Sequence, residues 1–110
     1  MGRVRIPVPP MTLLMSLITS GLVHAQQPEA GLVLAKHDCA ECHAVEKGAF
    51  VSPKAAAPRF EVIANTPGMT ATALTAALLT SHRTMPNLIL NANERSDVIA
   101  YILSLRRANQ

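Results

Sequence analysis

The chain has 110 residues, which favours a single domain, and its formal charge is +3. Apolar residues make up 49% of the sequence, but aromatic residues only 3%, and Trp is absent. The sequence has no basic cluster interleaved with aromatic residues, which excludes a recognisable nucleic-acid-binding surface. A small domain with so few large side chains is expected to fill its centre with something other than side chains.

The first 25 residues have the layout of a secretory signal peptide. A short basic start precedes the apolar run MTLLMSLITSGLV (Met11–Val23), and Ala25 ends a small-residue cleavage site. This run of 13 residues is well short of the roughly 20 that a membrane-spanning helix needs, which disfavours an uncleaved anchor. We expect export to the periplasm, cleavage near Ala25 and no stable membrane anchor, which leaves residues 26–110 as the working domain.

The first helix is expected over about residues 29–40, where Leu32, Ala35 and Cys39 recur at helical spacing. An irregular stretch with three prolines follows over residues 45–67, because prolines interrupt regular elements. A short helical piece is expected within that stretch at residues 60–64.

A second clear helix is expected over about residues 70–80, with Thr70 as its N-cap. Residues 81–90 are expected to form a loop. No strand pattern occurs in the mature sequence, so the fold is predicted to be all-α with long loops.

The last helix has the clearest pattern in the sequence. Asn91 and Glu94 form an N-x-x-E capping pattern at its start. A single apolar stripe follows at i, i+3, i+4 and i+7, made by Val98, Tyr101, Ile102 and Leu105. Arg106 and Arg107 are expected in the last turn, where cations interact favourably with the helix dipole.

The stretch CAECH, residues 39–43, holds the two cysteines of the chain. C-x-x-C occurs in disulfide-exchange sites, in zinc sites and in haem attachment, and an exported chain can also form a plain disulfide. A thioredoxin-like site needs a preceding strand, and a zinc site needs about four ligands, whereas only Cys39, Cys42 and His43 cluster here. C-x-x-C-H is the pattern of haem attachment, and this interpretation is favoured over the other three.

The spacing of this motif suits covalent attachment of one haem c. Each thiol adds to one porphyrin vinyl group, and one helical turn between Cys39 and Cys42 brings the two sulfurs to adjacent vinyl positions. His43 is then placed to bind the iron as the proximal axial ligand. The cofactor would occupy the centre of the fold, so we expect the chain without haem not to fold.

With these residues placed, the chain resembles the small bacterial class I cytochromes c over nearly all of residues 26–110. The likeness is an ordered set of features: Gly31 eight residues before Cys39, the CAECH motif, AAAPRF (55–60), TMPNLIL (84–90) and the helix SDVIAYILSL (96–105). It implies three main helices and long loops wrapped around one covalently bound haem.

The resemblance also implies roles for individual residues. Met85, followed by Pro86, would be the second axial ligand, and the carbonyl of Pro58 would accept a hydrogen bond from His43. Gly31 would pack against Tyr101. Met85 could instead be an ordinary loop methionine packed on the core.

Other residues have weaker claims on the haem. Met69 and His82 are alternative axial ligands. A histidine placed like His82 is more often exposed at the surface than bound to iron, and His37 is expected to be solvated. Four aliphatic residues are expected to line the haem pocket: Leu74, Leu78, Leu88 and Ile89.

The expected function is that of a monomeric periplasmic electron carrier between redox partners of a respiratory or dehydrogenase chain. Both axial positions would be filled by protein, so no enzymatic activity is expected. Docking is expected to be transient. Four cations either steer an acidic partner or are ordinary surface charges: Lys36, Lys47, Lys54 and Arg83. A haem-based sensor or small-ligand-binding domain with a labile Met85 is the alternative, followed by a secreted zinc or disulfide protein.

Overall fold

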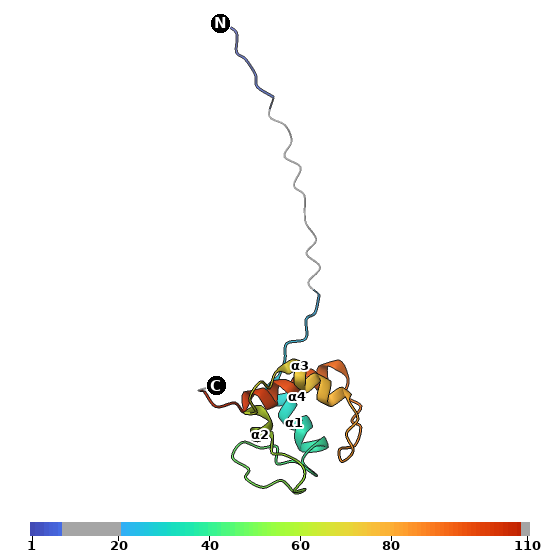
Figure 1. The fold of residues 1–110 in the computed structure, drawn as a ribbon. Helices are drawn as coiled ribbons and strands as arrows, with labels where there is room; N and C mark the ends of the chain where they lie inside the picture. The colour runs from blue at the N-terminus through green and yellow to red at the C-terminus, as the bar shows by residue number, and fades with distance from the viewer. Residues whose placement is uncertain (8–20, 109–110) are drawn as a thin grey trace.

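The structure is a computed structural model that describes residues 1–7 and 21–108. Within those residues it contains helices and no strands, which confirms the all-α prediction (Figure 1). The helices are α1 (Pro28–Asp38), α2 (Phe60–Ala64), α3 (Ala71–Leu79) and α4 (Ala92–Ser104). Most of the apolar run of the predicted signal peptide lies in residues 8–20, outside the described residues.

None of the helices among the described residues combines the length and the apolar character that a membrane-spanning helix requires.

Helix α1 begins one residue earlier and ends two residues earlier than expected. Pro28 stands in its first turn, where the fixed φ of proline suits helix initiation. Cys39 is the C-cap, and its backbone N–H donates to the Ala35 carbonyl. The CAECH motif therefore lies in the turn after α1 rather than inside the helix.

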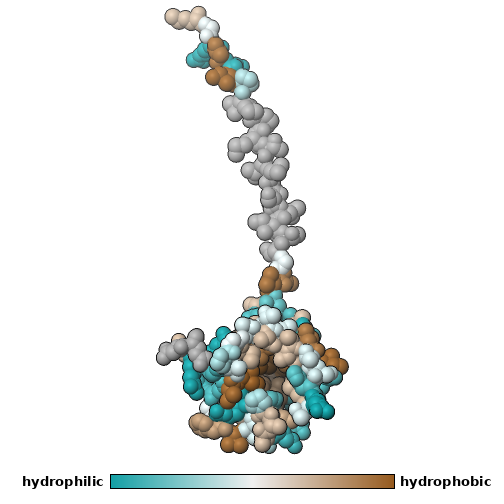
Figure 2. Space-filling view, viewed as in Figure 1, coloured by the Kyte–Doolittle hydropathy of each residue, from teal (hydrophilic) through white to brown (hydrophobic). Residues whose placement is uncertain are grey.

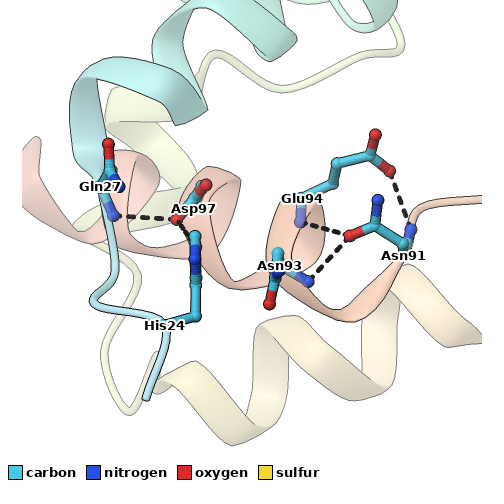
Figure 3. Close-up of polar contacts among 6 residues, drawn as sticks. All are labelled: His24, Gln27, Asn91, Asn93, Glu94 and Asp97. Carbon is cyan, nitrogen blue, oxygen red and sulfur yellow. Dashed lines mark hydrogen bonds and ion pairs between the residues drawn. The ribbon is translucent and has the colours of Figure 1, made fainter. Parts of the chain in front are cut away.

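The predicted helix starts in the second half of the chain are confirmed. The Thr70 side chain accepts a hydrogen bond from the Ala73 N–H at the start of α3. At the start of α4, the Asn91 side chain accepts from the N–H groups of Asn93 and Glu94, and the Glu94 carboxylate accepts from the Asn91 N–H (Figure 3). This reciprocal capping box satisfies backbone donors that would otherwise lack partners.

The prediction that Arg106 and Arg107 lie in the last turn of α4 is wrong, because the helix ends at Ser104. Instead of continuing the helix, the chain turns toward α2. The Asn65 side-chain amide donates to the Leu105 carbonyl at 3.2 Å, and the Arg106 Nε donates to the Ala64 carbonyl at 3.3 Å. The arginine thus caps α2 rather than α4.

The core forms where α1 crosses α4. A Cβ atom added to Gly31 would lie 2.0 Å from the Asp97 carbonyl oxygen and 2.8 Å from the Tyr101 Cβ, so only glycine permits this approach. The expected contact between Gly31 and Tyr101 is therefore present. The four residues of the predicted apolar stripe on α4 are all buried, which confirms its orientation.

Candidate functional site

A cavity of about 620 Å³ lies between the helices and the two long loops of the described structure. Its walls come from the end of α1, from residues 54–63, from α3, from residues 82–90 and from the inner face of α4. Figure 2 shows apolar atoms lining a hollow in the helical part of the molecule. The volume falls within the range of about 300–1,000 Å³ typical of sites for small molecules and cofactors.

The CAECH turn forms one end of this cavity. The His43 N–H donates to the Cys39 carbonyl at 2.9 Å, and the Cys42 N–H donates to the same carbonyl at 3.1 Å. These bonds close one helical turn, which holds both thiols and the imidazole beside the cavity. The structure thus places Cys39, Cys42 and His43 together at the cavity, as the motif predicted.

The His43 imidazole is oriented by the backbone of Pro58. The distance from His43 Nδ1 to the Pro58 carbonyl oxygen is 2.6 Å, as the resemblance implied. A carbonyl can only accept, so Nδ1 carries a proton, and in the neutral imidazole Nε2 is then the nitrogen with the free lone pair. This is the usual arrangement for a metal-binding histidine, in which the hydrogen bond at one nitrogen fixes the tautomer and strengthens the other as a ligand.

Phe60 also supports the imidazole, a role that the sequence analysis missed. Its side chain is buried, and its ring centroid lies 5.5 Å from that of His43. The signal was its position two residues after Pro58, at the start of the predicted short helix. Phe60 therefore supplies part of the aromatic lining that the composition suggested was absent.

The loop between His43 and Pro58 is attached to the rest of the fold at several points. The Ala44 carbonyl accepts from the Phe60 N–H at 3.0 Å, and the Ala44 N–H donates to Ser52 Oγ at 3.0 Å. The Tyr101 hydroxyl donates to the Val45 carbonyl at 2.7 Å in a buried contact. These bonds hold the backbone on both sides of His43.

Met85 is half-buried and lines the same cavity as His43. Leu74, Leu78 and Leu88 line it too, as expected. The prediction for Ile89 is wrong: its side chain is 98% exposed.

Leu90 lines the cavity in place of Ile89. Residues 86–90 lack helical structure, and in an extended chain neighbouring side chains point to opposite sides. Leu88 and Leu90 therefore share the inner side, and Ile89 faces outward.

The other candidate ligands differ in their surroundings. Met69 is half-buried and lines the cavity, so it is a geometric rival of Met85. His82 also borders the cavity, but it is exposed and its Nε2 lies 2.7 Å from the Ala77 carbonyl oxygen. His37 has an 85% exposed side chain beside Asp38, in agreement with the prediction that it is solvated.

The electrostatics of Cys39 disfavour thiol–disulfide exchange. Burial, followed by the nearby Asp38 carboxylate, raises the pKa of the Cys39 thiol to about 11. Reactive redox cysteines have a lowered pKa, because the thiolate is the nucleophile. Both cysteines are free thiols, and within the described residues no three His, Cys, Asp or Glu side chains are grouped to hold a metal ion.

The charges around the CAECH turn are mixed. Lys36 Nζ lies 2.8 Å from Glu46 Oε1 in an exposed ion pair, so this cation already has a partner. Lys54 borders the cavity together with Asp38 and Glu41. The surface near the motif therefore offers no purely positive patch for steering.

Comparisons of the chain with protein-family models, with curated proteins and with solved structures found no match.

Proposed function

We propose that the chain is an exported electron carrier with a class I cytochrome c fold and one haem c bound covalently through Cys39 and Cys42. In this proposal the iron is bound by His43 and Met85. The observation that carries it is that one cavity is lined by the CAECH turn, by Met85 and by a His43 imidazole whose Nδ1 is fixed by Pro58.

The residues present fit this group chemically. Two thiols can form thioether bonds, an imidazole and a thioether can bind iron, and the remaining wall is mostly aliphatic. An apolar wall also suits a porphyrin, which is buried away from water. A bound porphyrin would fill the centre of a chain that has few aromatic side chains to fill it. When bound, the group supplies one-electron oxidation and reduction of its iron.

The side chains around the site would then tune that chemistry. The hydrogen bond from His43 to Pro58 makes the imidazole a stronger donor, while a soft thioether ligand at Met85 favours the ferrous state. If His43 and Met85 both bind the iron, no position on it would remain open for a substrate. This favours a carrier over an enzyme.

The proposed partners are redox proteins that dock briefly over a small interface. The CAECH turn lies at the surface end of the cavity, with Glu41 exposed and both cysteines half-buried. Because the charges there are mixed, contact with partners would depend on local fit more than on long-range attraction. The proposed compartment is the periplasm, to which residues 1–25 would direct the chain before they are removed.

The ligand assignment is tested by comparing Met85→Ala with Met69→Ala, both made in the haem-loaded exported protein. We expect sharp, split bands in the reduced protein and a weak near-infrared ferric band from sulfur ligation. Met85→Ala should abolish the near-infrared band, and Met69→Ala should keep it because that methionine only packs against the cavity. Loss of the band in Met69→Ala alone would contradict the assignment.

A second candidate function is a haem-based sensor in which Met85 is a labile ligand. It is favoured by the loop at residues 81–90, in which no backbone–backbone hydrogen bond occurs in the described structure. Carbon monoxide distinguishes the two functions: immediate binding to the reduced wild-type protein indicates the sensor, and slow or absent binding indicates the carrier.

A further inference from the structure

Asp97 is a buried carboxylate that lies outside the proposed haem site. Its residue is only 7% exposed, where α4 crosses the start of α1. Its Oδ1 accepts a hydrogen bond from the Gln27 backbone N–H at 2.9 Å and lies 3.0 Å from His24 Nε2 (Figure 3). Both partners flank the predicted cleavage site after Ala25.

The sequence places the carboxylate there through Gly31. Because glycine lets α1 approach the Asp97 backbone so closely, the Asp97 side chain reaches the residue that precedes α1. Gln27 is the N-cap of α1, and its own side chain makes no capping bond. The carboxylate of a different helix thus serves an unsatisfied donor at the positive end of the α1 dipole.

Removal of residues 1–25 would take His24 away from this carboxylate. The new amino terminus would be Gln26, directly before the residue whose N–H already contacts Asp97. Consecutive Cα atoms are about 3.8 Å apart, so the new amine lies within reach of the same carboxylate. A cation at that position would stabilise the carboxylate that has lost its His24 partner.

We propose that the Asp97 carboxylate binds the α-ammonium group of Gln26 in the processed chain, an inference that rests on the proposed export and cleavage. The existing contacts lower the pKa of Asp97 below its ordinary value and so favour the charged carboxylate. The hydrogen bond from the Gln27 N–H is the largest contribution, burial opposes it, and His24 lowers the pKa further. The opposite charge would in turn raise the pKa of the α-amine.

This contact controls a chemical modification of Gln26. An amino-terminal glutamine can cyclise: its neutral amine attacks the side-chain amide carbon, a lactam C–N bond forms, and the amide nitrogen leaves as ammonia. Only the unprotonated amine can attack. An ammonium group paired with Asp97 is held protonated, so the structure assigns Asp97 the role of protecting the amino terminus from cyclisation.

Among the described residues, the other charged side chains at these two helix starts form no hydrogen bond or ion pair with Asp97. The Glu94 carboxylate accepts from the Asn91 N–H, and Arg95 Nη1 donates to the Leu90 carbonyl. Glu29 lies exposed in the first turn of α1. Neutralising Glu29 therefore removes a nearby negative charge without removing the proposed ion pair.

The test follows ammonia loss from Gln26 by mass spectrometry, in the haem-loaded exported protein held at pH 7. Asp97→Asn keeps an oxygen that can accept from Gln27 but loses the charge, and Glu29→Gln is the matched control. If the pair raises the amine pKa by one unit, Asp97→Asn should cyclise about tenfold faster than wild type. Glu29→Gln should cyclise at the wild-type rate.

A second measurement does not depend on folding of the variant. The pH dependence of α-amine labelling in the wild-type protein should give a pKa above the ordinary value of about 7.7–8.0. A chain that starts at Gln26 but has an ordinary amine pKa and equal cyclisation rates in all three proteins would overturn this inference alone. A chain that retains residues 1–25 would overturn both the inference and the proposed export.

Discussion

Residues 44–58 on the His43 side of the cavity and residues 81–90 on the Met85 side are attached to the helices in different ways. On the His43 side, backbone and side-chain bonds reach α2 and α4, including Phe60 N–H to Ala44 carbonyl and Tyr101 hydroxyl to Val45 carbonyl. In Figure 1 the two loops lie on opposite sides of α1 in the view, the first in green and the second in orange.

The Met85 side is held by side-chain contacts alone within the described structure. Ser81 Oγ donates to Asn87 Oδ1, His82 contacts the Ala77 carbonyl, and Arg95 donates to the Leu90 carbonyl. The difference indicates that the chain itself preforms the His43 side. Few bonds fix the backbone of the Met85 side, so we expect its conformation to depend on the group that occupies the cavity.

The largest effect is expected from replacing both thiols. Cys39→Ala with Cys42→Ala should prevent covalent attachment and leave the cavity without its contents, so that helical circular dichroism is lost. Glu41→Gln, an exposed position within the same motif, should retain both the haem and the helices. Native-like helicity in the double variant would show that the chain needs no cofactor to fold.

The next largest effect is expected from Gly31→Ala, which tests the helix crossing that supports the His43 side. The new Cβ would lie 2.0 Å from the Asp97 carbonyl oxygen, so α1 must move away from α4. Overpacking typically costs about 1–3 kcal/mol, and we expect the upper end here because the clash is with backbone atoms. Chemical denaturation should show this loss, while Val33→Ala at an exposed site on α1 should change stability little.

Tyr101→Phe should weaken the His43 side without disturbing packing. It leaves the Val45 carbonyl without its buried donor, at a cost of about 1–3 kcal/mol in the free energy of unfolding. If the urea midpoint of unfolding equalled that of the wild type, this hydrogen bond would not help to hold the His43 side.

The same variant has a pH signature. Burial, with smaller contributions from Glu46 and Glu61, raises the pKa of Tyr101. A raised folded pKa stabilises the protein below the unfolded pKa of about 10, and this stabilisation is lost as pH rises through the folded value. Tyr101→Phe should lack that alkaline decline.

The smallest effect is expected from Ser81→Ala on the Met85 side. The hydroxyl bonds Asn87 at 2.9 Å in an exposed position, so its removal should change stability by no more than about 0.5 kcal/mol. If Met85 is the iron ligand that we propose, Ser81→Ala should also speed its displacement by added imidazole. A stability loss as large as that of Tyr101→Phe would mean that both sides are equally preformed.

The sequence predicted correctly those features that depend only on residues close together in the chain. The Asn91 capping box, the Thr70 cap and the CAECH turn depend on residues a few positions apart, and all three are present. The resemblance added the long-range contacts of Gly31 and Pro58, which periodicity alone does not indicate.

The misjudged features depend on contacts between distant segments. The end of α4 is determined by Asn65 and Arg106 reaching across to α2, and the inward positions of residues 86–90 follow from the direction of an extended loop. The sequence analysis did not single out Asp97, because nothing near it in the sequence indicates a partner 70 residues away.

The central claim is that the CAECH turn carries a covalently attached haem. The most direct test is the intact mass of the protein exported from cells that possess haem-attachment machinery, followed by peptide mapping. The account predicts a chain that starts at Gln26 and carries the mass of one haem on the peptide with Cys39 and Cys42. An exported chain with both thiols unmodified, or joined to each other, would contradict it.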